Sequence, residues 1–283
     1  MIITDKNKKY PKRLLEIKEH PKKLYVEGNI DLLNKNEIVA IVGTRKCTEY
    51  GKEQAKRFSN FLAKKDVCII SGLARGIDSI AHYYAKSEKG KTIAVIASGF
   101  NNIYPKENEK LFKEIIDEGG CVISEYEPNT EVNMLNFPKR NRIISGLAKI
   151  TLVVEARYRS GSTITARCAV KQGRELLCIP GNIDKLSSYG TNKLISEGLA
   201  KIVISPQEII EELNISEEGK ITDIQLEDRY KEIYNQINDI PISNNEIARR
   251  IKKEISEINE ILFMLEVDGF IKGLPGDKYV REY

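Results

Sequence analysis

One apolar run near the middle of the chain decides the fold, and it reads Ile150-Thr151-Leu152-Val153-Val154-Glu155. Its composition predicts a buried strand. A basic stretch, residues 136–145, stands before it, and a polar loop, residues 157–163, follows it. Similar apolar runs recur on both sides and alternate with helical patterns, so this strand is one of a series.

The recurring apolar runs consist largely of Ile, Val and Ala, and each predicts a short strand. They lie at residues 38–42, 67–70, 92–96, 121–124, 150–155, 176–179 and 201–204. Helices are predicted between them, at about residues 55–62, 77–87, 106–118, 162–171 and 192–197. Apolar strands that alternate with helices imply a parallel sheet covered on both faces. We therefore expect an α/β fold with a doubly wound, mostly parallel Rossmann-like sheet.

The two ends of the chain differ in character from this series. Residues 1–36 are polar with short apolar patches, and we expect a lead-in packed on the main domain, residues 37–213. A short acidic helix is predicted at 208–213 and a linker at 214–222. The remainder, residues 223–283, predicts helices at 230–237, 246–251 and 255–267 and a hairpin at 270–279. Three helices and a hairpin describe a small winged-helix domain.

Composition bounds the class of protein. Of the 283 residues, 41% are hydrophobic, which is enough for a globular core. No run of about 18 apolar residues is present and the first residues lack a signal-peptide run, so we expect a cytoplasmic protein without a membrane span. The five cysteines are scattered and only two histidines occur, which argues for reduced core thiols and against a Cys/His metal site. We expect neither a metal nor a cofactor.

Positive charge is concentrated in the large part of the chain. Residues 220–283 carry 10 Lys and Arg against 13 Asp and Glu, which leaves 35 and 28 of the totals of 45 and 41 for residues 1–219. A basic partner surface is therefore expected on the main domain.

The basic stretch 136–145 has an unusual charge placement. Pro138 is expected at the first helical position, with Lys139, Arg140 and Arg142 in about the first turn. Cations usually avoid the positive end of a helix dipole. Fixed positive charge beside free helix N–H groups makes a site for anions, although a solvated basic turn is the plain alternative.

Small polar residues follow several of the predicted strands, where ligands bind in sheets of this kind. These loops are Gly43-Thr44-Arg45, Ser71-Gly72, Ser98-Gly99 and residues 157–163. Glycines let a backbone approach a phosphate closely, although any one of them can simply make a tight turn. Several such loops at one edge, with Arg45, Arg75 and the basic stretch nearby, favour a polyanion over a mononucleotide.

Several catalytic motifs are missing. The chain has neither a P-loop nor a Gly-x-Gly-x-x-Gly turn, which argues against a P-loop ATPase and ordinary dinucleotide binding. His82 is interpreted as a local hydrogen-bonding residue, and Ser71 and Ser162 have no evident partner base. Glu125 and Glu155 both end strands at the ligand edge, where they would either act as an acid–base pair or position an arginine.

Four segments carry a resemblance to a known family. They are Ser71-Gly72-Leu73-Ala74-Arg75-Gly76-Ile77-Asp78 with Ala81-His82; Phe137-Pro138-Lys139-Arg140-Asn141-Arg142-Ile143-Ile144-Ser145-Gly146-Leu147; Val153-Val154-Glu155-Ala156 with Ser160-Gly161-Ser162-Thr163-Ile164-Thr165-Ala166; and Pro180-Gly181 with Gly190-Thr191-Asn192-Lys193-Leu194-Ile195. The chain resembles the DNA-processing protein A (Smf) family over roughly residues 10–205, and its tail resembles the winged helix of that family.

The resemblance implies a non-enzymatic, cytoplasmic, homodimeric protein that binds single-stranded DNA, helps load the RecA recombinase on it, and serves natural transformation in competent cells. The DNA pocket of the family carries over to Gly43, Thr44, Arg45, Ser71, Gly72, Lys139, Arg140 and Asn141. Thr44 stands where the family usually has serine, and Ala97-Ser98-Gly99-Phe100-Asn101-Asn102 replaces a more usual Gly-x-Gly-x-Asp pattern.

The residues predicted to bind DNA combine both lines of reasoning. They are Gly43, Thr44, Arg45, Ser71, Gly72, Arg75, Phe137, Lys139, Arg140, Asn141, Arg142, Ser160, Gly161, Ser162 and Thr163. Phe137 would stack on a base, or else belong to the core.

Two further questions stay open at this point. A nucleotide-binding sensor or an enzyme similar to nucleoside-monophosphate phosphoribohydrolases is the alternative function, although the Pro-Gly-Gly-x-Gly-Thr motif of those enzymes is absent. The third helix of the tail carries Glu257, Glu260 and Glu266, whereas a DNA-reading helix would be basic. A protein-contact or regulatory role is therefore predicted for the tail.

Overall fold

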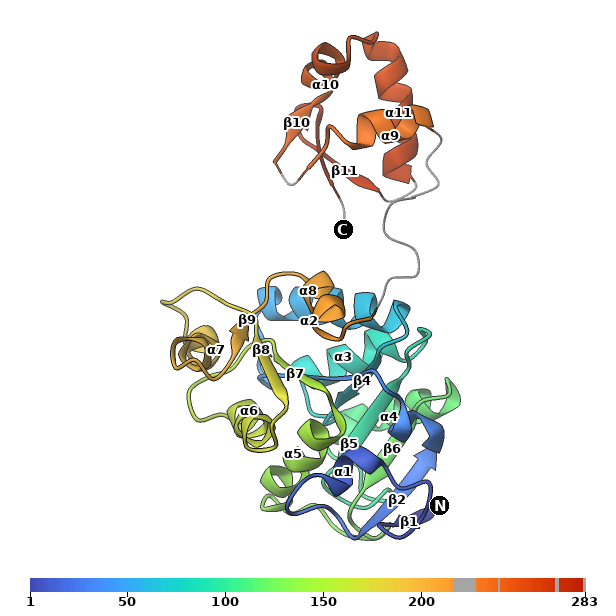
Figure 1. Cartoon of the computed structure of the whole chain (residues 1–283), viewed down its shortest axis with the longest axis vertical. Helices are drawn as coiled ribbons and strands as arrows, with labels where there is room; N and C mark the ends of the chain where they lie inside the picture. Colours follow the sequence, from blue (N-terminus) through green and yellow to red (C-terminus); the bar gives the residue numbers. More distant parts are fainter. Residues whose placement is uncertain (216–227, 239, 268–269, 282–283) are drawn as a thin grey trace. The chain divides into compact units, whose positions relative to one another are not determined.

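The computed structural model describes residues 1–215, 228–238, 240–267 and 270–281 and divides the chain into two units, Met1–Ile215 and Ser216–Tyr283 (Figure 1). Each unit has a hydrophobic core of its own. None of the helices in these residues is long and apolar enough to cross a membrane.

A nine-stranded sheet forms the centre of the large unit, in the order β1-β2-β6-β5-β4-β3-β7-β8-β9. From β3 onward all pairings are parallel, and only β1 and β2 are antiparallel to their neighbours. The strands are β1 (Ile2–Thr4), β2 (Lys23–Gly28), β3 (Ile38–Val42), β4 (Cys68–Ser71), β5 (Thr92–Ile96), β6 (Cys121–Ser124), β7 (Ile150–Val153), β8 (Glu175–Cys178) and β9 (Lys201–Ile202). The predicted fold class, a doubly wound and mostly parallel sheet, is confirmed.

Helices cover both faces of this sheet because the central strands are apolar on both sides. All five residues of β3 are buried, as are all five of β5. One face packs on α2 (Glu49–Lys64), α3 (Ile77–Ala85), α4 (Glu109–Asp117) and α8 (Pro206–Glu212). The other packs on α1 (Lys12–Leu15), α5 (Asn136–Leu147), α6 (Gly161–Lys171) and α7 (Leu186–Ser196). Two short 3-10 turns, η1 (Ile30–Asn34) and η2 (Lys106–Asn108), complete the unit.

Helix α2 shows how the pattern of residues produces such a helix. The Thr48 side chain accepts a hydrogen bond from the Gly51 N–H and caps the first turn. Ala55, Phe58 and Leu62 recur at helical spacing and are fully buried against the sheet. Burial of a side chain such as Phe58 or Leu62 contributes about 1.5–3 kcal/mol, so packing stabilises α2 more than its cap does.

The N-terminal segment contributes more than a packed lead-in. β2 pairs antiparallel with β6, with Tyr25 opposite Ser124, and β1 pairs with β2, so the segment extends the sheet by two strands. Leu14 and Leu24 of this segment are fully buried in the main core.

Helix α7 begins earlier than the predicted helix at 192–197. Its first turn contains Ser187, Ser188 and Gly190, residues that usually indicate a loop. Gly190 is required there, because its N–H donates to the Ala156 carbonyl at 2.7 Å and a Cβ would lie 2.7 Å from that oxygen. Close packing on the loop after β7, rather than helix propensity, sets the start of α7.

The small unit contains α9 (Asp228–Tyr234), β10 (Ile242–Ser243), α10 (Asn244–Ile251), α11 (Ile255–Val267), β11 (Ile271–Leu274) and β12 (Lys278–Arg281). Its strands form an antiparallel sheet in the order β10-β12-β11. The three helices close over a core that includes Ile233, Ile247, Leu262 and Ile271. This is the expected winged helix with its hairpin, whereas most of the predicted linker, residues 216–222, lies outside the described residues.

Candidate nucleic-acid interface

The strand order reverses between β3 and β7, because β4, β5 and β6 follow β3 on one side while β8 and β9 follow β7 on the other. Open α/β sheets bind ligands in the crevice outside the carboxyl ends of strands at such a switch point. A cavity of about 410 Å³ lies there. Its walls come from the loop after β3, the start of α3, the first turns of α5 and the start of α6.

The cavity brings together most of the residues predicted to bind DNA. Those that line it are Gly43, Thr44, Arg45, Phe137, Arg140, Asn141, Ser160, Gly161 and Ser162. They come from three segments far apart in the sequence, and the topology of the sheet alone places the three side by side.

Three predicted residues are instead used to hold the loops in place. Ser71 is fully buried and its hydroxyl donates to the Ile41 carbonyl at 2.6 Å. The Gly72 N–H donates to the Asp78 carboxylate at 3.1 Å. The Thr163 hydroxyl donates to the Ser160 carbonyl at 2.7 Å. None of the three lines the cavity.

Two predicted cations lie near the rim. Arg75 makes a bidentate ion pair with Glu107, with donor–acceptor distances of 2.6 and 2.7 Å, and borders a small hollow shared with Arg45 and Phe137. Lys139 is exposed in the first turn of α5. Neither lines the cavity itself, although Lys139 lies in sequence between two residues that do, Pro138 and Arg140.

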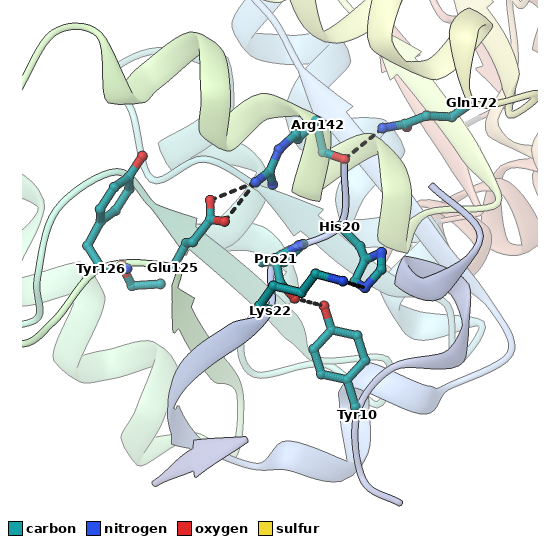
Figure 2. Close-up of polar contacts among 9 residues, drawn as sticks. Tyr10, His20, Pro21, Lys22, Glu125, Tyr126, Arg142 and Gln172 are labelled. Atoms are coloured by element: carbon teal, nitrogen blue, oxygen red, sulfur yellow. Dashed lines mark hydrogen bonds and ion pairs between the residues drawn. The ribbon is translucent and has the colours of Figure 1, made fainter. Parts of the chain in front are cut away.

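Arg142 does not line the cavity. Its side chain extends toward Glu125 (Figure 2). Its Nη2 atom lies 2.7 and 2.9 Å from the two carboxylate oxygens of Glu125, and its carbonyl accepts a hydrogen bond from Gln172 at 2.9 Å. Arg142 therefore braces α5 against the end of β6 and against α6. Glu125 thus positions an arginine, one of the two roles considered for it.

A buried arginine, Arg140, and a buried carboxylate, Asp78, line the floor of the cavity. Arg140 is 4% exposed, and its guanidinium donates to the carbonyls of Gly72 and Val95 and to the Asn141 side chain. Burial lowers the pKa of Arg140 to about 10, while the Asp78 carboxylate opposes that change, so the guanidinium stays charged at neutral pH. Arg140 therefore places a fixed positive charge at the floor of the cavity.

Asp78 belongs to the site, although no role is predicted for it from the sequence. It is 7% exposed and lines the cavity. Burial raises its pKa, and the charge of Arg140 and backbone N–H groups of Gly72, Ala74 and Gly43 oppose that rise. Asp78 thereby gathers the loops after β3 and β4 around one carboxylate. Its position at the start of α3, after a Ser-Gly turn, is the signal that could have identified it.

Aromatic side chains stand at the cavity mouth. The Arg45 guanidinium carbon lies 5.3 Å from the centre of the Phe137 ring, and the ring of Tyr104 contacts Phe137 edge-on at 5.7 Å. Phe137 is half-buried and lines the cavity, so it is available for stacking rather than being part of the core. Cations that lie over aromatic rings are typical of surfaces that bind nucleic acid bases.

The start of α6 brings hydroxyl and N–H groups to the cavity. Its N-cap residue Ser160 makes no capping hydrogen bond, and the hydroxyls of Ser160 and Ser162 lie 2.9 Å apart. Asn141 of α5 donates to the Gly161 carbonyl at 3.2 Å and links the two helix starts. The first N–H groups of α6 lack partners within the helix, so this end favours an anion.

The start of α5 differs from the prediction. The helix begins at Asn136, so Pro138 is its third residue rather than its first. Proline is tolerated there because the N–H groups of the whole first turn have no partner inside the helix. A turn closed by the Asn136 N–H and the Asn133 carbonyl, at 3.0 Å, starts the helix early.

Groups considered for catalysis are engaged elsewhere. Glu155 is 2% exposed and accepts hydrogen bonds from the Thr48 N–H at 2.9 Å and hydroxyl at 2.6 Å. His82 is fully buried and bonds to Leu73 and Thr92, as the local interpretation predicts. Neither Glu155 nor Glu125 lines the cavity. Within the described ranges, no three His, Cys, Asp or Glu side chains gather as a metal would need.

Comparison with known protein families finds a match for each of two segments of the chain. The family described as DNA recombination-mediator protein A matches residues 1–214, and the domain described as DprA winged helix matches residues 222–277. Protein Smf of Escherichia coli is 38% identical over 282 residues, which cover 96% of this chain and 75% of that protein. DNA processing protein DprA of Bacillus subtilis is 42% identical over 207 residues, 73% of this chain and 69% of its own length.

Two solved structures agree with this assignment. DNA processing protein A of Streptococcus pneumoniae superposes with a TM-score of 0.71 at 41% identity and covers 75% of this chain and 74% of that one. The Helicobacter pylori protein, whose structure is described by its single-stranded DNA binding mode, superposes with a TM-score of 0.68 at 34% identity and covers 75% of this chain and 95% of that one. This chain belongs to the DNA recombination-mediator protein A family, also called DprA or Smf.

Proposed function

We propose that this protein binds single-stranded DNA in the cavity at the switch point and acts there as a non-catalytic recombination mediator. One observation carries the proposal: Arg45, Arg140, Phe137 and the free start of α6 meet around one cavity. Membership of a DNA-processing family supports it, and so does the single-stranded DNA binding described for the Helicobacter pylori relative.

The geometry favours a single strand over a duplex. Phosphates are attracted to Arg45, Lys139 and the α6 N–H groups, and Arg140 adds charge from the floor. An unpaired base can enter a cavity of about 410 Å³ and stack on Phe137. A base within a duplex would first have to be unstacked and unpaired, which costs a few kcal/mol.

Arg45→Ala tests the cavity directly. We expect weaker binding to all single strands regardless of sequence. The slope of log affinity against log salt concentration should become less negative by about 0.7, because one phosphate contact is lost. Fluorescence anisotropy with labelled oligonucleotides over a range of salt measures both quantities. Lys64→Ala is the matched control, since Lys64 is an exposed cation at the carboxyl end of α2. Equal affinity in Arg45→Ala and the parent would remove Arg45 from the site.

A catalytic role is tested with the same preparation. Glu125, Glu155 and His82 are engaged in hydrogen bonds that hold the scaffold, so we expect no turnover of nucleotides. Incubation with AMP followed by chromatography of the free base measures this. Release of adenine that depends on a cavity residue would favour a nucleoside-monophosphate phosphoribohydrolase instead.

We further propose that the DNA-bound protein is a homodimer that delivers its strand to the RecA recombinase, as in natural transformation of competent cells. Light scattering of the free and DNA-bound protein gives the mass. RecA filament formation on single strands, with and without this protein, gives the loading activity. A monomer that leaves RecA filament formation unchanged would restrict the role to DNA binding.

A further inference from the structure

A second cavity, of about 340 Å³, lies beside the first turn of α6. Ser162 and Thr165 of α6 line the first cavity, whereas Thr163 and Arg167 line the second. Ile164 lines both, so one helical turn separates the two. A bound strand that leaves the first cavity across Ile164 would enter the second directly.

The second cavity is basic. Arg159 comes from the loop after β7, Arg167 from α6 and Lys193 from α7. The single acidic residue in its lining, Glu197, lies 3.4 Å from Lys193 in an i,i+4 ion pair. Over the described ranges, no ion pair involves Arg159 or Arg167. Two exposed guanidinium groups are therefore available to an anion.

Exposed aromatic rings accompany these cations. Tyr158 lines the cavity and is 53% exposed, and its ring contacts that of Tyr189 edge-on at 5.7 Å. The Arg159 guanidinium carbon lies 5.2 Å from the centre of the Tyr158 ring. The combination repeats that of Arg45 and Phe137 in the first cavity. Cations beside exposed aromatic rings suit a sugar-phosphate chain with unpaired bases.

We propose that the second cavity is a further subsite for the same single strand, in which Arg167 and Lys193 bind phosphates and Tyr158 stacks on a base. The strand crosses the first turn of α6 at Ile164, so the two subsites hold neighbouring segments of one strand. This proposal rests on the proposed function of the first cavity. It adds Arg167 of α6, which stands outside the segments that carry the family resemblance, and it gives a role to Lys193 of α7, which lies within one of them.

The test uses length, because only a long strand can reach both cavities. Anisotropy is measured for oligothymidylates of about 3 to about 12 nucleotides, a range that spans common single-strand site sizes. Arg167→Ala, Lys193→Ala and Tyr158→Ala are compared with the parent and with Lys64→Ala. All are exposed or partly exposed positions, so the fold tolerates them.

We expect the shortest strands to bind the parent and every variant alike. The longest strands should bind Tyr158→Ala at least about fivefold more weakly, the lower end of what one stacked base contributes. They should also bind Arg167→Ala more weakly, because a phosphate contact is lost. For the longest strands, the slope of log affinity against log salt concentration should become less negative by about 0.7 in Arg167→Ala and in Lys193→Ala, because each variant loses one phosphate contact. Arg167→Lys should keep most of the slope, because it keeps the charge.

Three results overturn the subsite. Equal affinity of the longest strand for Arg167→Ala and the parent removes the contact. A loss that is the same for short and long strands assigns Arg167 to the first cavity. A change in molecular mass of the variants, with DNA binding intact, assigns the cavity to contact with a second copy. Failure of the proposed function looks different, since the parent would then bind no strand of any length.

Discussion

At the level of single residues, His82 makes the stability of the scaffold depend on pH. Burial, and to a smaller extent the nearby charge of Arg140, lower the pKa of His82 from 6.5 to about 3. Its Nε2 accepts the Leu73 N–H at 3.3 Å. Its Nδ1 lies 2.7 Å from the Thr92 hydroxyl, which itself donates to Ile69, so Nδ1 must donate. A second proton on Nε2 would face the Leu73 N–H, so the folded state excludes it.

The sign follows from this lowered pKa. Stabilisation by neutral His82 is complete above pH 6.5 and is lost as the pH falls toward about 3, at up to about 1.4 kcal/mol per pH unit. Chemical denaturation between about pH 7 and about pH 5 measures the free energy of unfolding. We expect the parent to lose about 1–2 kcal/mol more over this range than His82→Gln. Parallel pH profiles for the two proteins would contradict the assignment.

At the level of secondary-structure elements, sequence patterns identified most strands and the edge at which the loops meet, because apolar runs and the carboxyl-edge rule are local and topological. They did not separate Arg140 from Arg142. Residues two apart on a helix point to different faces, so only one of them can reach the cavity. The recurrence of Phe137, Arg140 and Ile144 at helical spacing marks the correct face of α5. Strand β1 was not found because three residues carry no measurable alternation.

The contact between the end of β7 and the start of α2 leads to a testable prediction about stability. Glu155 caps the start of α2 through Thr48, and the Glu155 carbonyl accepts the Thr44 N–H at 2.8 Å, which ties the loop after β3 to β7. Glu155→Ala removes a carboxylate that is 2% exposed and leaves the Thr48 N–H and hydroxyl without this acceptor, so we expect the free energy of unfolding to fall by about 1–3 kcal/mol. Glu49→Ala, at the exposed carboxylate beside it, should change it by less than about 1 kcal/mol. Urea unfolding measures the free energy of unfolding of both variants. Similar losses would show that the Glu155 contact with Thr48 stabilises the protein no more than an exposed carboxylate does.

At the level of the whole molecule, the two units have opposite electrostatic character. The cavity and its cations belong to Met1–Ile215, whereas α11 in the small unit exposes Glu257, Glu260 and Glu266. Phe263 is 63% exposed on the same helix, beside the exposed Met264. A helix with carboxylates and exposed apolar side chains is repelled by phosphates and suits a protein partner.

Separating the units tests this division. The small unit has its own core of isoleucine and leucine side chains, so a fragment of residues 216–283 should fold alone. We expect residues 1–215 to keep the single-strand affinity of the full chain, and the small unit to bind duplex DNA no more tightly than ordinary non-specific binding, about 10⁻⁴–10⁻⁶ M. Band shifts with both fragments and both forms of DNA measure this, and circular dichroism checks that each is folded. Tight duplex binding by the small unit would contradict the protein-contact role predicted for it.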